Sequence, residues 1–450
     1  MPIDVGRFGQ VSGCVFCTEN TLYYPIRQCY RVNKKFDREK CGRRRIKIDN
    51  TLDFPEDKMK YIVVLGDGMA DWKCDEIDGK TPLEFANTPN MDLIAERGRC
   101  GMLRTVSQGF DPGSDVANLG VLGYRAEECY TGRGPLEAVS MGIDLKPADL
   151  AYRCNLVNVT DGVMNDFSAG HISSAEGALL FKELNEKLPA RARGYPGVSY
   201  RNLLVIGDGR GATTKPPHDI TGEKIAEYVP KGGDEDILAE CVAISREVFK
   251  DSPVNKKRIA EGKTPATQIW PWSGGKKPVL ENFREKYGVS AGMISAVDLL
   301  NGIAVCAGMK TIRVPGATGY LDTDYKAKAD YAIKALKDGL DFVYMHVEAP
   351  DEAGHLGSLK EKVLAIERLD GVIGEILDAF EGEELRIAVL PDHPTPIALK
   401  THTADPIPFA IMGPGIEADS CQVYSEAEAA AYGGYGQLNA KDFLHTFFGN

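Results

Sequence analysis

Carboxylates and imidazoles follow three short apolar runs of this sequence, which end at positions 65, 347 and 390. A further histidine stands before the next apolar run, and the full set is Asp67, Asp351, His355, Asp392, His393 and His402. Such groups are ligands of Mn²⁺, Zn²⁺ and similar ions, and six exceed what one catalytic ion with open positions needs. The set therefore predicts two metal ions. For any single aspartate the alternative is a helix cap or a turn.

A serine could supply a nucleophile to such a site. Two metal ions clamp the attacking and leaving oxygens of a phosphoryl group, and a metal-bound hydroxyl is deprotonated easily. Ser114 follows Pro112 and Gly113 and precedes an apolar segment that begins like a helix. A serine there can aim its oxygen at an anion held by backbone N–H groups. The alternative is that Ser114 only caps the helix.

The elements that must position these residues alternate between strands and helices. Short continuous apolar runs are typical of strands buried on both faces, and amphipathic spacing from Leu359 to Leu377 predicts a long helix. The predicted strands cover 61–65, 203–206, 342–347, 387–390 and 407–411. Strand, helix and strand in this order indicate an α/β fold with a largely parallel sheet, whose strands end at one edge.

The middle of the chain differs from the parts around it. Residues 149–283 have strands and helices of their own. Toward the end of this range, from Lys250 to Pro278, lies a tract rich in Pro, Gly and Lys that we expect to be a loop. We therefore predict an inserted second α/β domain over 149–283. The metal-binding domain would be discontinuous, over 59–148 and 284–450.

Residues 1–58 carry twelve Lys and Arg against eight Asp and Glu, a net charge of +4, whereas the remainder carries −16. We expect a poorly ordered leader, or sequence upstream of the real start. Cys14 and Cys17 have the spacing of a zinc knuckle, but Cys29 and Cys41 do not form the second pair, which argues against zinc.

Composition excludes several classes of protein. With 450 residues, 43% of them hydrophobic, the chain is long and apolar enough for two or three folded domains. The net charge of −12 disfavours broad binding to nucleic acid or anionic membranes. No apolar run approaches the length of a membrane span, and the first 30 residues lack a secretory pattern, so we expect a cytoplasmic protein.

Eight separated motifs resemble one family and occur in its order. They are LGDGMADW, GKTPLEFANTPNMD, PGSDVANLGVLGY, YTGRGPLEA, DFSAGHIS, VPGATGYLDT, HVEAPDEAGH and DHPTPIALKTHTADPIPF. Over residues 59–450 the sequence resembles the cofactor-independent phosphoglycerate mutases, archaeal-type branch, of the alkaline phosphatase superfamily. The first 58 residues have no counterpart in that family. The resemblance implies the doubly wound, mostly parallel sheet of that superfamily with an inserted domain.

The resemblance also implies roles for particular residues. Ser114 would become phosphoserine and His171 would move a proton. One metal ion would be held by Asp67, Ser114, Asp392 and His393, and the other by Asp351, His355 and His402. The ions would be Mn²⁺, with Zn²⁺, Co²⁺ or Mg²⁺ as alternatives, and no 2,3-bisphosphoglycerate is needed. The reaction would interconvert 3- and 2-phosphoglycerate.

Residues that bind the substrate are less clearly marked. A phosphorylated acid calls for arginine forks. The candidates are Asp115, Arg133, Arg153, Arg201 and Lys310, each of which could instead form a structural ion pair. The same site motifs fit a homoserine kinase that uses ATP, or a plain metal phosphatase, because the choice of acceptor would be made in the inserted domain. A binding protein that has lost activity is disfavoured, since every implied ligand position is kept. Oligomeric state is not predicted.

Overall fold

The computed structural model describes residues 59–449 and, before them, four short strands. These are β1 (Gln10–Val11), β2 (Cys14–Cys17), β3 (Thr21–Tyr23) and β4 (Tyr30–Arg31), which pair in that order as an antiparallel sheet. They belong to a unit of residues 1–56 that is separate from residues 57–450. The predictions about residues 1–58 and their cysteine side chains lie outside the described residues.

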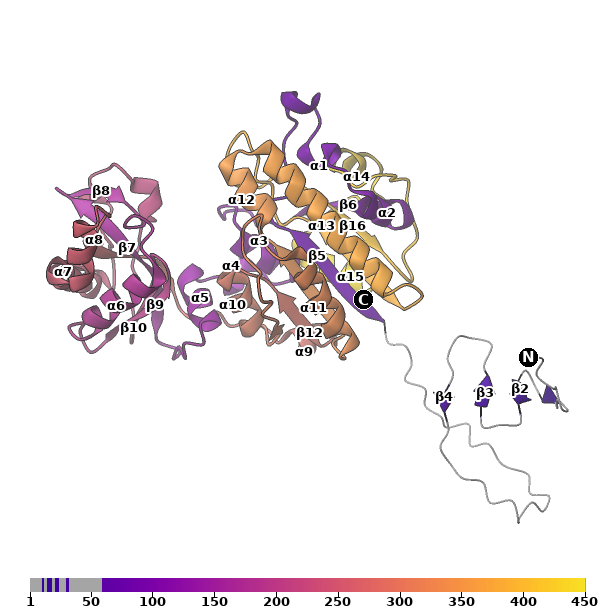
Figure 1. Cartoon of the computed structure of the whole chain (residues 1–450), viewed down its shortest axis with the longest axis horizontal. Coiled ribbons are helices and arrows are strands. Elements are labelled where there is room, and N and C mark those ends of the chain that lie inside the picture. Colours follow the sequence, from indigo (N-terminus) through magenta and orange to yellow (C-terminus); the bar gives the residue numbers. More distant parts are fainter. Residues whose placement is uncertain (1–9, 12–13, 18–20, 24–29, 32–58, 450) are drawn as a thin grey trace, which may run out of the picture. The chain divides into compact units, whose positions relative to one another are not determined.

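The predicted site residues follow strands of an eight-stranded sheet, several of whose strands are labelled in Figure 1. Its strands, in spatial order, are β13 (Lys310–Thr311), β12 (Ala291–Ile294), β14 (Phe342–Val347), β5 (Lys60–Gly66), β15 (Leu385–Leu390), β16 (Ile407–Met412), β6 (Arg99–Arg104) and β17 (Gln437–Asn439). The first five strands run parallel, and β16 is antiparallel to both of its neighbours. The mostly parallel sheet is therefore confirmed.

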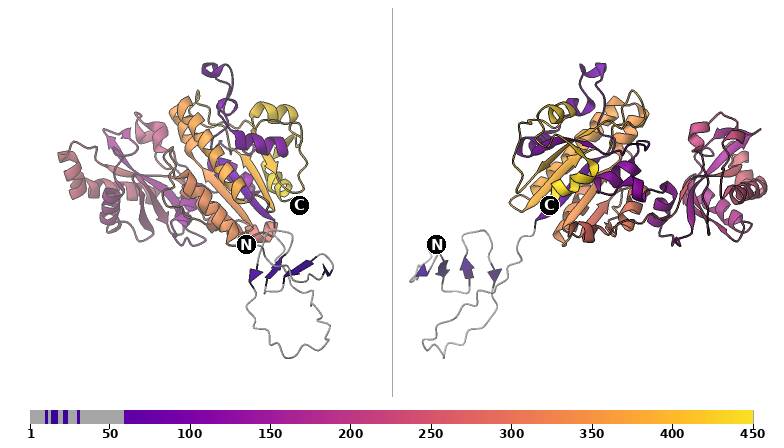
Figure 2. Two further views of the ribbon diagram at one scale, coloured as in Figure 1. Left: turned by 45° about the vertical axis from the view of Figure 1, so that its right-hand side comes forward. Right: turned by 180° about the vertical axis from the view of Figure 1, so that it is seen from behind.

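Helices cover both faces of this sheet, which explains why β5 is apolar throughout. Ile62 and Val64 pack in one core with α2 (Pro89–Arg97), α11 (Tyr325–Lys337), α13 (Leu359–Ala379) and α14 (Glu426–Tyr432). Val63 and Leu65 point to the opposite core, with α3 (Ser114–Val121), α10 (Asp298–Cys306) and α15 (Ala440–Phe448). The right-hand view of Figure 2 shows α15 on the face opposite α13. The predicted helix over 359–377 is confirmed as α13.

A second sheet lies wholly within the middle of the chain. Its order is β11 (Gln268–Gly275), β7 (Leu150–Thr160), β10 (Arg201–Ile206) and β9 (Ala192–Val198), with β8 (Val163–Asp166) paired to β7, and every pair is antiparallel. Its helices are α6 (Ser174–Asn185), α7 (Glu235–Asp251) and α8 (Pro253–Ala260). Apolar side chains from β7, β10 and these helices form a core of their own.

The prediction of a loop from Lys250 to Pro278 is wrong. Pro253 occupies the first turn of α8, where its missing N–H is not needed, and Ser252 caps that helix. Pro271 lies in β11, which is an edge strand with one free side, so a proline can be accommodated there. Trp270 and Trp272 are 2% and 6% exposed and anchor β11 to β7.

The remaining helices are short. They are α1 (Pro82–Phe85), α4 (Ala126–Cys129), α5 (Arg133–Ser140), α9 (Phe283–Tyr287) and α12 (Ala349–Leu356), together with 3₁₀ segments at Asp75–Ile77, Pro217–Ile220 and Ile225–Glu227. Among the described residues no helix is long and apolar enough to cross a membrane.

Candidate active site

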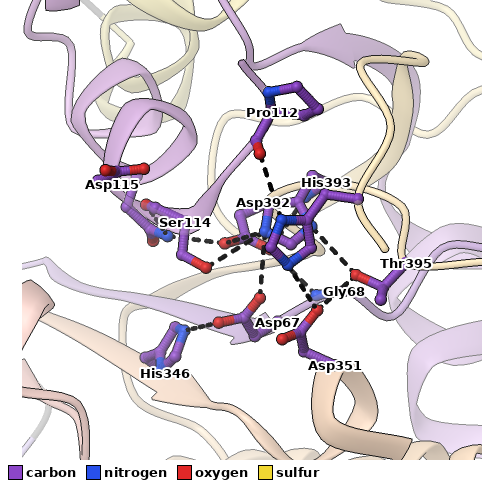
Figure 3. Close-up of polar contacts among 12 residues, drawn as sticks. Asp67, Gly68, Pro112, Ser114, Asp115, His346, Asp351, Asp392, His393 and Thr395 are labelled. Carbon is purple, nitrogen blue, oxygen red and sulfur yellow. Dashed lines mark hydrogen bonds and ion pairs between the residues drawn. The ribbon is translucent and has the colours of Figure 1, made fainter. Parts of the chain in front are cut away.

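The loops after β5, β14 and β15 bring the six predicted side chains together at one edge of the sheet. Figure 3 shows four of them, Asp67, Asp351, Asp392 and His393. Asp67 directly follows β5, and Asp392 directly follows Pro391 at the end of β15. Asp351 and His355 lie on α12, which begins just after β14. Because β14, β5 and β15 are neighbours and parallel, their carboxyl ends meet here.

One group of ligand atoms is formed by Asp351, His355 and His402. His355 Nε2 lies 3.2 Å from Asp351 Oδ2 and 3.0 Å from His402 Nε2, while His402 Nε2 lies 3.5 Å from Asp351 Oδ1. The outer ring nitrogens donate to backbone carbonyls, His355 Nδ1 to Lys400 O at 3.0 Å and His402 Nδ1 to Pro112 O at 3.2 Å. Such bonds orient the inner nitrogens toward a shared ion.

A second group shares Asp351 and adds Asp67 and His393. His393 Nε2 lies 3.5 Å from Asp67 Oδ1 and 3.5 Å from Asp392 Oδ2. The rings of His393 and His402 are 4.2 Å apart, so the two groups adjoin. Two adjacent sets of mixed oxygen and nitrogen ligands are suited to two divalent ions.

The surroundings of Asp67 would suit a bound cation. Its carboxylate is 0% exposed, and Oδ1 has no hydrogen-bond partner in the structure. Burial, together with the neighbouring carboxylates of Asp392 and Asp351, raises the pKa of Asp67 well above its usual range. A bound divalent ion would satisfy the orphaned oxygen and offset the repulsion, so the residues present fit such an ion.

The pKa of Asp351, which lies beside His355 and His402, is shifted in the opposite direction to that of Asp67. Burial works against ionisation of Asp351, but hydrogen bonds from His355 and His402 outweigh it and hold the pKa of Asp351 well below its usual range. The hydrogen bond to Asp351 raises the pKa of His355 to about 9. Asp351 and His355 therefore form an ion pair in this structure.

Ser114 is the first residue of α3, as its sequence context predicts. Its Oγ lies 3.2 Å from His393 Nε2, which places the hydroxyl beside the ligand group. Gly113 precedes it in the cap position with extended backbone, and no side chain caps the helix N-terminus. Ser114 is therefore placed to present its oxygen to the site.

Asn118, one turn further along α3, is a site residue that the sequence did not reveal. Its amide donates to Asp392 Oδ2 and to Ser114 O, both at 2.8 Å, and its Oδ1 accepts a 2.6 Å bond from Tyr344. Asn118 is 0% exposed. It joins the serine helix to the ligand loop after β15, and nothing in its sequence context signals a partner 274 positions away.

His346 lies buried within β14. Its Nε2 also donates to Asp67 Oδ2 at 2.8 Å, while Ser295 Oγ lies 3.3 Å from Nδ1. Burial lowers the pKa of His346 to about 3, so the ring is neutral. A neutral ring that donates from Nε2 orients the carboxylate of Asp67.

Two candidates for substrate binding, Asp115 and Arg133, form an ion pair with each other beside Ser114. Arg133 Nε lies 3.0 Å from Asp115 Oδ2, and Tyr130 donates to the same oxygen. These bonds and the charge of Arg133 outweigh burial and lower the pKa of Asp115. Arg133 is therefore ion-paired in this structure, with its side chain 33% exposed.

Arg153, Arg201 and His171 belong to the second sheet and its connections. Arg153 forms a 3.0 Å ion pair with Glu137, and its guanidinium lies 4.4 Å above the ring of Trp272. Arg201 lies 5.4 Å above the ring of Tyr200. His171 is exposed and has a left-handed backbone with φ 46°. Burial and the charges of Arg133 and Arg201 lower the pKa of Arg153, so positive charge gathers here.

Lys310 is not brought to the ligand loops. It pairs with Gly292, which in turn pairs with Val343 near the start of β14. The ligands follow the opposite end of these parallel strands, and Lys310 is exposed on the edge strand β13.

A curated protein of Methanothermobacter thermautotrophicus named 2,3-bisphosphoglycerate-independent phosphoglycerate mutase 2 is 53% identical over 373 residues, which are 82% of this chain and 92% of that protein. This chain belongs to the 2,3-bisphosphoglycerate-independent phosphoglycerate mutases. The sequence model of that family matches residues 95–255. The family predicted from the eight motifs is confirmed.

Further curated proteins and solved structures are similar to this chain in sequence or fold. A probable mutase of Geobacter sulfurreducens is 50% identical, with 83% of this chain and 96% of that protein covered. A solved structure of a Pyrococcus horikoshii protein is 32% identical, with a TM-score of 0.76 and coverage of 87% and 97%. The cofactor-independent mutase of Thermoplasma acidophilum, at 24% identity and a TM-score of 0.61 over 87% and 99%, shares the fold.

Proposed function

We propose that this chain interconverts 3-phosphoglycerate and 2-phosphoglycerate by way of a phosphoserine on Ser114. The observation that carries the proposal is the position of the Ser114 hydroxyl, 3.2 Å from His393 within the Asp and His cluster of a chain 53% identical to a named mutase. A serine at that place in a chain of this family is a nucleophile in reach of two candidate ion sites.

The candidate ligands would hold two divalent ions, which we propose to be Mn²⁺. Asp67, Ser114, Asp392 and His393 would hold one, and Asp351, His355 and His402 the other. Bound ions of this kind neutralise charge on a transferred phosphoryl group and favour ionisation of a hydroxyl.

The reaction then needs two transfers by the chain's own groups. The Ser114 hydroxyl gives up its proton and its Oγ bonds to phosphorus as the bond from phosphorus to the 3-oxygen breaks, and that oxygen takes up a proton. In the return step the 2-hydroxyl of glycerate loses a proton and bonds to the same phosphorus, while Ser114 Oγ is released and takes up a proton again. The two transfers consume neither ATP nor water, and His171 is the proposed proton carrier.

The acid groups of the substrate need cations near Ser114. We propose Arg133, Arg153 and Arg201 for this role, with Asp115 holding Arg133 in place. A guanidinium fork matches the geometry of phosphate or carboxylate. Lys310 is left out, because its strand position is far from the ligand loops.

We further propose that residues 149–283 form an inserted substrate domain, whose separate antiparallel sheet and core support this division. The bound glycerate must turn without leaving, so water has to be excluded while phosphate is on the serine. Hinges near residues 145–150 and 283–290 would allow the two domains to close.

The test offers three reactions to one preparation. Purified protein loaded with Mn²⁺ is incubated with 3-phosphoglycerate alone, with ATP and homoserine, and with a simple phosphate ester in water. The proposal expects formation of 2-phosphoglycerate and little free phosphate. Phosphorylation of homoserine, or hydrolysis without isomerisation, would assign a kinase or a phosphatase instead.

A further inference from the structure

Lys362 is a fully buried lysine whose ammonium group has all of its hydrogen bonds filled. The side chain is 0% exposed and lies in the first turns of α13. Its Nζ donates to Ala70 O at 3.1 Å, to Asp71 Oδ2 at 2.7 Å and to Thr395 O at 2.8 Å. An ammonium group has three N–H donors, so each has one acceptor.

These three acceptors belong to the two loops that carry candidate metal ligands. Ala70 and Asp71 follow Asp67 in the loop after β5, and Thr395 follows Asp392 in the loop after β15. The loops touch at this point, because Thr395 N donates to Ala70 O at 3.2 Å. The ammonium group therefore lies where the two loops meet and bonds to both.

Short contacts lead from this meeting point to the ligands. Thr395 Oγ1 donates to Asp351 Oδ1 at 2.5 Å and lies 3.3 Å from His393 Nδ1. Gly68 N donates to Asp392 Oδ1 at 3.1 Å. A shift of the loop after β15 would move ligands of both groups, since that loop carries His393 of one group and His402 of the other.

Asp71 extends the connection beyond the two loops. Its Oδ2 accepts from Lys362 and from Ile397 N at 3.1 Å, and its Oδ1 accepts from Trp72 N at 2.7 Å. Asp71 N donates to Glu426 Oε1 at 3.2 Å. The carboxylate is therefore fully bonded and fixes the backbone on both sides of the ammonium group.

Stability alone does not explain a buried Lys and Asp pair. Removing two charges from water costs several kcal/mol, and apolar residues of similar volume are often as stabilising. What an apolar side chain cannot do is bond to acceptors on two separate loops at once. The buried pair of Lys362 and Asp71 is therefore explained by the positions of the two loops, which it fixes.

We propose that Lys362 is a positioning residue for the metal centre. It holds the loops after β5 and β15 in the relative position that brings Asp67, Asp392 and His393 together. This inference rests on the proposed function, because it takes that cluster to be the metal site. Groups that orient metal ligands without touching the ion typically change metal affinity by about 10- to 100-fold. Lys362 is expected to act within that range.

The test compares metal-free proteins, prepared with a chelator, by titration with Mn²⁺ alone and measurement of free Mn²⁺ by electron paramagnetic resonance. The variants are Lys362→Met, the neutral pair Asp71→Asn with Lys362→Met, and Arg386→Met as control. Arg386 is a cation, 8% exposed, near the other end of β15, and it bonds to Phe447 O at 2.7 Å and Pro414 O at 2.6 Å.

We expect Lys362→Met and the neutral pair to weaken Mn²⁺ binding by about 10- to 100-fold, and Arg386→Met to change it by less than about twofold. If Lys362→Met fails to fold, the neutral pair decides, since it leaves no unpaired buried charge. Unchanged Mn²⁺ affinity in the Lys362 variants, or an equal loss in Arg386→Met, would overturn the inference. Wild type that binds Mn²⁺ but does not isomerise phosphoglycerate would contradict only the proposed function.

Discussion

Ser114 combines a helix N-terminus, a neighbouring imidazole and a nearby set of carboxylates in one position. Its Oγ has the 3.2 Å contact with His393, and its carbonyl accepts from Asn118 one turn later. This makes the hydroxyl both exposed to the site and fixed in direction. A serine that only capped the helix would not need to lie beside the loop after β15, which carries Asp392 and His393.

Ser114→Ala removes the proposed nucleophile and little else. We expect isomerase activity to fall by more than about 10³-fold, because no acceptor for the phosphoryl group remains. The rate is measured with 3-phosphoglycerate at saturating Mn²⁺, and Ser107→Ala in the preceding loop is the control. Activity of Ser114→Ala within tenfold of wild type would rule out a phosphoserine at this position.

Asn118→Ala would remove the hydrogen bonds that Asn118 makes to Asp392 Oδ2 and to the Tyr344 hydroxyl, both of which are buried. An unmet buried polar group costs about 1–3 kcal/mol, so we expect the free energy of unfolding of the metal-free protein to fall by about that amount. Urea unfolding measures it. An unchanged midpoint would mean that these bonds do not hold α3 to the loop.

At the scale of elements, the turn after β5 is as constrained as the strand itself. Gly68 has φ +58°, and a Cβ there would lie 2.5 Å from Asp351 Oδ1 and closer still to Thr395 Oγ1. Left-handed backbone and crowding both require glycine at this position. The turn therefore allows the ligand loops to approach each other.

Gly68→Ala tests that crowding, with Gly79→Ala as a matched control. Gly79 also has positive φ, +73°, but nothing lies within 4 Å of a Cβ there. We expect Gly79→Ala to cost about 1–2 kcal/mol through backbone strain alone. Gly68→Ala should cost more and also weaken Mn²⁺ binding at least tenfold, as judged by thermal unfolding and metal titration. Equal effects of the two changes would show that only strain matters.

Strand ends were the part of the site that the sequence could predict. Runs such as 342–347 predict a buried strand, and the residues after them must lie at the sheet edge, which is how the six candidate ligands were predicted. Asn118, Thr395 and Lys362 could not be predicted, because each acts through partners distant in sequence and has a residue type common in any helix or turn.

The tract around β11 was missed for a related reason. Pro271 and the flanking glycines are typical of loops, and only the pairing of β11 along one side of β7 makes a proline acceptable. Edge position is a property of the whole sheet, so local composition could not reveal it. Helix α13, by contrast, depends on its own spacing, and its residues 359–377 were predicted to be helical.

At the scale of the whole molecule, an anionic substrate meets a chain of net charge −12. Attraction must then be local, from metal ions and from the arginines gathered near Arg153. Long-range steering by the overall charge would work against binding.

Stability of the whole molecule should depend on pH through Glu426. Burial raises the pKa of this carboxyl to about 7 from an ordinary 4.5, even though Thr81 and Asp71 N–H bond to it. Since the folded pKa is the higher one, the protonated form favours folding at low pH, and that contribution is lost as pH rises from about 4.5 to about 7. The carboxylate is therefore a source of instability above neutrality.

Glu426→Gln should remove this dependence. We expect the variant to gain roughly 1–3 kcal/mol relative to wild type between pH 5 and pH 8, measured as the difference in free energy of unfolding by urea at each pH. Parallel pH profiles for the two proteins would show that Glu426 titrates normally.

The central claim is that phosphate passes through Ser114 on its way between the two oxygens of glycerate. The most direct measurement is to mix Mn²⁺-loaded enzyme with 3-phosphoglycerate, quench in acid within a turnover, and map phosphate by peptide mass spectrometry. We predict phosphoserine at position 114 in wild type and none in Ser114→Ala. Isomerisation that proceeds with no phosphate on Ser114, or with phosphate on another residue, would contradict the claim.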